Sequence, residues 1–200
     1  MSDMWNADRS GNRLPPTCED TTGPYHPIQF YDARLSDLTV IGPGLVVAPR
    51  GAPIEIAGAV HDRHGALASG VTLEFWQANA AGVYRTPATE GDPGLDPWFD
   101  GFGRLRADDG RYLFRTVMPG PAPGRAPCVT ITLFSDGIAR IATQMFFAGD
   151  EANHGDPLLA SLPADERERL MARETTRGLW RFDIHMAGPV ETPFFEDLLA

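Results

Sequence analysis

Short stretches in which apolar and polar side chains alternate run through this sequence, and glycine and proline separate them. The clearest six occupy residues 53–62, 70–78, 110–120, 128–134, 140–150 and 178–188. Alternation with a period of two is typical of strands that bury one face. The 21 glycines and 18 prolines supply the turns between the strands. The pattern therefore predicts an all-β fold, an antiparallel β-sandwich with long loops rich in proline and glycine.

One segment departs from this alternation. Residues 163–174 begin with Pro163, which suits the first turn of a helix. Asp165 and Glu166 follow, where the helix dipole favours acidic side chains. We therefore expect one short helix at about 163–174.

The polar N-terminal stretch marks a boundary in the chain. Residues 1–20 contain few apolar side chains and end near Pro15 and Pro16. Such a segment buries too little apolar surface to order itself, which predicts a flexible N-terminal arm. The folded β-sandwich domain is expected to span residues 21–200.

Charge and cysteine content restrict the class of protein. The 17 basic residues, all arginine, stand against 27 acidic ones, a net charge of −10 that repels phosphates and anionic lipids. We therefore expect neither nucleic acid nor a membrane as a partner. The start lacks the apolar core of a signal peptide, and no run of 18 apolar residues occurs. Cys18 and Cys128 form no disulfide or zinc pattern, which favours a cytoplasmic protein with reduced thiols.

Two histidines close in sequence, His61 and His64, raise the question of a metal site. They lie at a turn formed by residues 63–65, and solvated histidines are common at turns. A metal site would need further ligands from elsewhere in the chain. We interpret them as turn residues. His185 falls in an alternating stretch and His154 in a polar loop, and neither pattern indicates a ligand.

Four blocks of sequence carry a resemblance to a known family. They are IAGAVHDRHGALASGVTLEFWQANAAGVY (56–84), FGRLRADDGRYLFRTVMPGPAP (102–123), RAPCVTITLF (125–134) and RFDIHMAG (181–188). Over roughly residues 21–197 the chain resembles the intradiol ring-cleavage dioxygenases. Within that family it is most similar to the catalytically silent alpha chains of the enzymes that act on protocatechuate.

The resemblance implies a set of vestigial ligand positions. Catalytic members of the family hold Fe(III) with two tyrosines and two histidines, because phenolates stabilise this hard ion and imidazoles leave room for substrate. The first tyrosine falls at Tyr84 and the second at Ala122, and the histidines fall at Cys128 and Thr130. Three of the four ligands are absent, so the resemblance implies no metal and no catalytic residue in this chain.

An alpha chain of this kind pairs with a homologous beta chain in an (αβ)n assembly, and the beta chain binds the Fe(III) that acts on an aromatic diol and O₂. The resemblance implies that Thr21, Gly23, Tyr25 and Asp136 line the pocket shared with that partner. Alpha chains carry arginine where Asp136 stands, and a carboxylate there opposes an anionic substrate. Arg140 is a candidate for the missing charge.

Two further residues lie near these positions in the sequence. His26 is the neighbour of Tyr25, which makes it a candidate for the same pocket. Arg125 stands where catalytic chains keep an arginine near the substrate, but with no metal expected here we predict a structural ion pair instead.

Two other functions compete with that of a silent subunit. The first is a stand-alone β-sandwich binding module without enzymatic activity, since such sandwiches serve many roles. The second is a self-sufficient oxygenase with a rearranged ligand set such as Tyr84, Cys128 and a loop histidine.

Overall fold

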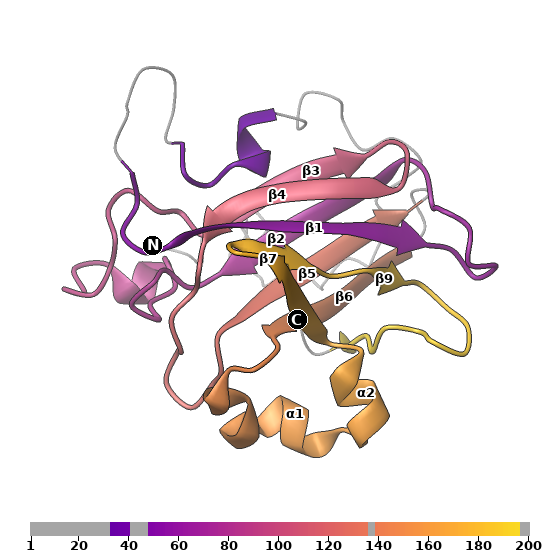
Figure 1. The fold of residues 1–200 in the computed structure, drawn as a ribbon. Helices are drawn as coiled ribbons and strands as arrows, with labels where there is room; N and C mark the ends of the chain where they lie inside the picture. Colours follow the sequence, from indigo (N-terminus) through magenta and orange to yellow (C-terminus); the bar gives the residue numbers. More distant parts are fainter. Residues whose placement is uncertain (1–32, 41–47, 136–138, 197–200) are drawn as a thin grey trace, which may run out of the picture.

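A computed structural model describes residues 33–40, 48–135 and 139–196 of the chain (Figure 1). Its strands are β1 (Pro53–His61), β2 (Val71–Gln77), β3 (Phe102–Ala107), β4 (Arg111–Val117), β5 (Cys128–Ser135), β6 (Ala139–Phe147), β7 (Met171–Thr176), β8 (Leu179–Arg181) and β9 (Ile184–His185). The helices are α1 (Pro157–Ser161) and α2 (Ala164–Glu168), with 3₁₀ turns at Ala33–Ser36, Pro87–Thr89 and Glu151–Gly155. Within these residues no helix is long and apolar enough to cross a membrane.

The strands form two layers that β7 joins along one side (Figure 1). One layer has the order β3-β2-β5-β6 and the other the order β4-β1-β8, with β9 added to β1. The predicted all-β sandwich is confirmed, although its pairing is not purely antiparallel. Strand β1 pairs in parallel with β8 and β9, and β6 pairs in parallel with β7.

The main core lies between the two layers. Phe75 of β2 stacks on Phe114 of β4 across them, with ring centroids 4.1 Å apart and planes 9° from parallel. Val129, Ile131 and Leu133 of β5 are fully buried in the same cluster. Full burial of each such side chain stabilises the fold by roughly 1.5–3 kcal/mol. Because side chains alternate along a strand, the other residues of β5 face away from this core.

A second, smaller core covers that other face near the start of β5. It is formed by Ala126, Cys128, Phe146, Leu159 and Leu170. Leu159 belongs to α1, whose first turn is fixed by a buried cap. Asp156 accepts hydrogen bonds at Oδ1 from the N–H groups of Leu158 and Leu159, and Pro157 occupies the first helical position.

The helix expected at 163–174 is wrong over its second half. Helix α2 ends at Glu168, and Met171–Thr176 form strand β7. Methionine, alanine, arginine and glutamate are good helix formers, but here their propensity is outweighed by pairing with β6 and β8 and by the burial of Ala172. Helix α1 lies outside the expected range altogether.

Candidate functional site

Tyr84 is held in place by the turn that follows β2. Asn79 Oδ1 accepts hydrogen bonds from two backbone N–H groups of that turn, at 2.9 and 3.0 Å. Gly82 adopts φ +80°, and a Cβ atom there would lie 2.1 Å from the carbonyl oxygen of Pro121. Only glycine fits both conditions. The hydroxyl of Thr89 donates to the carbonyl oxygen of Tyr84 at 2.6 Å, which fixes the residue at the outer face of the sandwich.

A row of side chains crosses this outer face from strand to strand. Trp76 of β2 lies opposite Thr130 of β5, and Thr130 lies opposite Gln144 of β6. Tyr84 stacks on Trp76 with ring centroids 5.8 Å apart, and its hydroxyl lies 4.0 Å from the sulfur of Cys128. The structure thus brings Tyr84, Cys128 and Thr130 together, although they are far apart in the sequence.

Arg125 ties this row to the helical segment. Its Nε donates to Asp156 Oδ2 at 2.8 Å, and its terminal Nη2 donates to Gln144 Oε1 at 2.6 Å. Gln144 Nε2 in turn donates to Thr130 Oγ1 at 3.2 Å. The side chain of Asp156 has no exposed surface, and its Oδ2 also accepts from the N–H of Ala126. The ion pair expected of Arg125 is therefore present, and its charge is compensated.

Burial keeps the phenol of Tyr84 and the thiol of Cys128 protonated. Desolvation raises the pKa of Tyr84 far above its ordinary value of 10, and the nearby Cys128 adds to the rise. Desolvation likewise raises the pKa of Cys128, against the lowering effect of the charge on Arg125. The pKa of Arg125 is raised, because the hydrogen bond and charge of Asp156 outweigh the lowering effect of burial. The cluster is thus a neutral phenol and a neutral thiol beside a guanidinium ion.

These residues do not fit a ferric ion. Ala122 lies beside the turn of Tyr84, its backbone N 3.3 Å from where a Cβ atom of Gly82 would be, and its methyl group offers no donor atom. The Thr130 hydroxyl already accepts from Gln144, and the phenol and thiol resist the deprotonation that ligation requires. In the part of the chain that the structure describes, no cluster of three or more histidine, cysteine or acidic side chains could hold a metal ion.

The other predicted site residues lie outside this cluster or outside the described residues. Thr21, Gly23, Tyr25 and Asp136 lie outside the described residues, as does His26, so their pocket roles stay predictions. Arg140 is exposed near the start of β6.

The remaining histidines have local partners. His61 stacks on His185, which faces it across the β1–β9 pair, with ring centroids 4.6 Å apart. His64 Nε2 accepts a hydrogen bond from Arg63 Nε at 3.0 Å. His154 Nδ1 lies 3.0 Å from the carbonyl oxygen of Glu151. None of these contacts gathers the donor set of a metal centre.

Sequence reasoning missed Asp156 and Gln144, the two partners of Arg125. The Asp156-Pro157 pair carries the signature of a helix start, which pointed to a cap and could have been recognised. Gln144 carries no such signal, because its place opposite Thr130 depends on the register between β5 and β6.

Comparison with known proteins shows similarity to dioxygenases. A family model described as Dioxygenase (Dioxygenase_C) matches residues 43–179. The chain is 33% identical over 196 residues to the protocatechuate 3,4-dioxygenase alpha chain of Burkholderia cepacia, covering 92% of this chain and 98% of that one. It is 37% identical over 161 residues to the protocatechuate 3,4-dioxygenase beta chain of Burkholderia cepacia, covering 72% and 68%.

A solved structure agrees with the fold. The dioxygenase domain of a dioxygenase carbohydrate-binding protein fusion from Streptomyces sp. SirexAA-E matches with a TM-score of 0.58 and 23% identity, over 90% of this chain and 100% of that one. The chain belongs to the intradiol ring-cleavage dioxygenase family. Within the family, it is similar to both chains of protocatechuate 3,4-dioxygenase, and it matches an alpha chain over nearly its full length.

Proposed function

We propose that this chain is the non-catalytic alpha subunit of a heteromeric Fe(III) intradiol dioxygenase. Its partner is a homologous beta subunit that binds the iron, and together they cleave protocatechuate to 3-carboxy-cis,cis-muconate. The reaction adds both atoms of O₂ across the bond between the two hydroxyl-bearing ring carbons. This chain contributes a wall of the substrate pocket and assembly contacts.

The observation that carries the proposal is the donor set around Tyr84. A protonated phenol, a protonated thiol, a methyl group and a hydroxyl already engaged by Gln144 stand where a ferric site needs four nitrogen or oxygen ligands. Iron chemistry therefore has to come from another chain.

The comparisons add support of a different kind. The relative named as an alpha chain matches over 98% of its length, whereas the one named as a beta chain matches over 68% of its own. The existence of two separately named chains supports an αβ assembly. A cytoplasmic location is also proposed, in keeping with the free, buried thiol of Cys128.

Co-expression with a candidate beta chain tests the proposal. The chain purified alone is expected to be colourless and free of iron, whereas the co-purified complex is expected to show the red-brown colour of tyrosinate bound to Fe(III). Only the complex should consume O₂ when protocatechuate is added. A chain that runs on gel filtration as a monomer with or without the candidate partner would favour the stand-alone binding module instead.

A matched variant separates the two chains' roles. Tyr84→Phe in this chain removes its only retained ligand type, and we expect the colour and turnover of the complex to stay within about twofold of wild type. A loss of iron or of activity in this variant would contradict the silent-subunit proposal. Tyr25→Phe is the contrasting variant, because Tyr25 is proposed to line the shared pocket together with Thr21, Gly23 and Asp136.

A further inference from the structure

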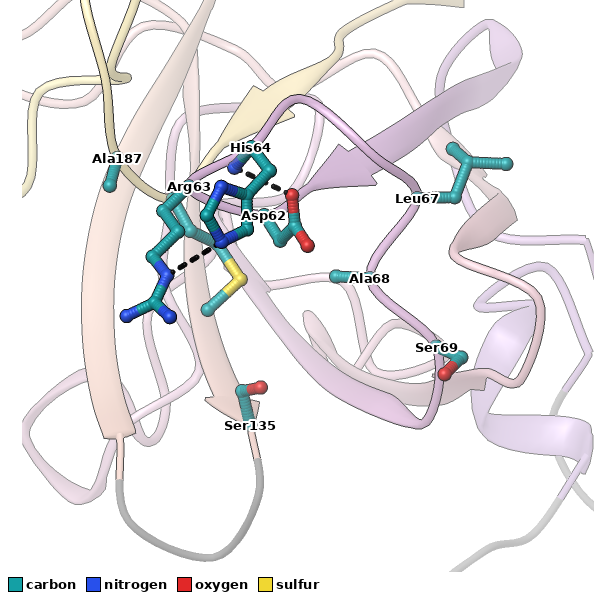
Figure 2. A pocket seen from close by; sticks show the side chains of 9 residues that line it. Asp62, Arg63, His64, Leu67, Ala68, Ser69, Ser135 and Ala187 are labelled. Carbon is teal, nitrogen blue, oxygen red and sulfur yellow. Dashed lines mark hydrogen bonds between the residues drawn. The ribbon is translucent and has the colours of Figure 1, made fainter.

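A cavity of about 610 Å³ opens beside the turn that follows β1 (Figure 2). Its volume lies within the range of roughly 300–1,000 Å³ that is typical of small-ligand sites. The lining comes from the 62–69 turn, the end of β5 and the segment after β9. The residues are Asp62, Arg63, His64, Leu67, Ala68, Ser69, Ser135, Met186 and Ala187.

Arg63 brings a positive charge to this cavity, and the carboxylate of Asp62, which also lines it, attracts that charge. Its Nε donates to His64 Nε2, as Figure 2 shows, while its two terminal nitrogens make no hydrogen bond or ion pair with any described residue. Among the described residues, Asp62 makes no direct ion pair with the guanidinium, although the two charges attract each other. Asp62 Oδ1 accepts from the N–H groups of His64 and Ala66 at 2.8 and 3.0 Å, so this carboxylate holds the turn together.

Two hydroxyl groups of the cavity are also available to a ligand. The hydroxyl groups of Ser69 and Ser135 have no hydrogen-bond partner among the described residues, although both line the cavity. The apolar part of the lining is formed by Leu67, Ala68, Met186 and Ala187. A lining of polar groups and apolar side chains suits a ligand with a charged end and an apolar body.

We infer that this cavity binds a small aromatic carboxylate. The planar fork of Arg63 matches a carboxylate, which it can grip with two parallel hydrogen bonds. Ser135 supplies a further donor, and the aromatic ring lies against Met186 and Ala187. Nothing in the vestigial cluster could play this role, since each polar group there already has a partner.

The site also bears on the proposed function, and this step rests on that function being correct. Protocatechuate is an aromatic carboxylate, and the chain has Asp136 where an arginine would be expected to attract it. Arg63 then supplies the positive charge, in place of Arg140.

Fluorine NMR titration with 4-fluorobenzoate tests the inference directly. The full chain is used in the form in which it purifies, alone or with its partner chain. We expect saturable binding that becomes about tenfold weaker in Arg63→Gln, because one charge-assisted, bidentate contact is lost. Ser135→Ala should weaken binding about threefold, as expected for one neutral hydrogen bond. The control Arg111→Gln removes an exposed arginine of β4 outside the cavity lining and should have no effect.

Neutral 4-fluorobenzamide serves as the ligand control and should show no dependence on Arg63. Equal affinity of wild type and Arg63→Gln for 4-fluorobenzoate would overturn the inference, as would an equal loss with the neutral analogue. In the active complex, Arg63→Gln should raise KM for protocatechuate about tenfold while leaving kcat, and KM for uncarboxylated catechol, unchanged. A complex inactive on every catechol would contradict the proposed function but leave the titration decisive for the cavity.

Discussion

The cluster around Tyr84 and the cavity beside Arg63 both contain an arginine, but the two arginines differ in their surroundings. Arg125 is linked to the fully buried carboxylate of Asp156 and to Gln144, and through Gln144 to Thr130. Among the described residues, Arg63 donates one hydrogen bond, to its neighbour His64, its charge is attracted by Asp62, and its side chain lines an open cavity. The charge of Arg125 is therefore compensated by protein groups, whereas the guanidinium of Arg63 is accessible to a ligand.

This difference shows where to look for function in a chain that we propose to be non-catalytic. Polar residues that converge on one face of a fold can be hydrogen-bonded to one another and serve stability alone. Polar residues at a cavity that lack protein partners are the better indicators of binding.

Reinstating the missing ligands gives the largest expected change. In the variant Ala122→Tyr with Cys128→His and Thr130→His, the chain carries two phenols and two imidazoles at the four positions. We expect iron content to rise from essentially none toward about one ion per chain, with a red-brown colour, because the scaffold still brings these positions together. Iron content by elemental analysis and the visible spectrum are the measurements. The same variant without Ala122→Tyr serves as the control and should bind iron more weakly.

Removing the buried carboxylate tests whether the Arg125 network is structural. Asp156→Ala leaves Arg125 without its partner and removes the cap of α1, so we expect the free energy of unfolding to fall by about 3 kcal/mol or more. Urea denaturation measures the loss. The control Asp100→Ala breaks the exposed pair with Arg85 and should cost less than about 1 kcal/mol. Similar losses in both variants would remove the distinction between the buried network and the surface.

The thiol of Cys128 reports on the closure of the same region. With Cys18 replaced by serine, only Cys128 can react with a thiol reagent. Because the thiol is buried and its pKa is raised, we expect labelling at pH 8 to be on the order of a hundredfold slower in the folded protein than in urea. Rapid labelling of the folded chain would mean that the cluster is as open as the Arg63 cavity.

The smallest expected effect concerns the stacked histidines near the cavity. Burial, with the neighbouring His61 adding to it, lowers the pKa of His185 below its ordinary value of 6.5, while Asp183 opposes this. The unfolded chain therefore takes up the proton first as the pH falls. The free energy of unfolding should be level above about pH 6.5 and decrease below it. Thermal melts of wild type and His185→Gln from pH 8 to pH 5 isolate this contribution, which should be missing from the variant.

The sequence predicted the strands well where one face is buried and poorly where tertiary pairing decides. The alternation at 128–134 became β5, whose period of two places Cys128 and Thr130 on one face. Strand β3 went unrecognised, because its inward face consists of Gly103, Leu105 and Ala107, which offer one large apolar side chain and so give a weak signal. The sequence predicts helix for residues 171–174 of β7, because nothing in their composition reveals that β6 and β8 lie on either side of them.

The sequence also predicted only part of the candidate sites. The resemblance led to Tyr84, Ala122, Cys128 and Thr130, but not to the Arg63 cavity, whose lining is gathered from three separate segments. A cavity of that kind depends on how loops meet at the end of a sandwich, and no local pattern encodes it. Spatial arrangement, and not residue type, distinguishes Arg63 from the other arginines of the chain.

The pairing of β1 has a consequence for synthesis of the protein. Glu55 of β1 pairs with Leu179 of β8, which follows it by 179 − 55 = 124 residues. At about 5–20 residues per second, a ribosome needs roughly 6–25 s to deliver that partner. Throughout this delay the nascent chain presents β1 with one edge open, and such an edge readily joins a strand of another molecule. Folding in the cell thus depends on shielding β1 until the last few strands have emerged.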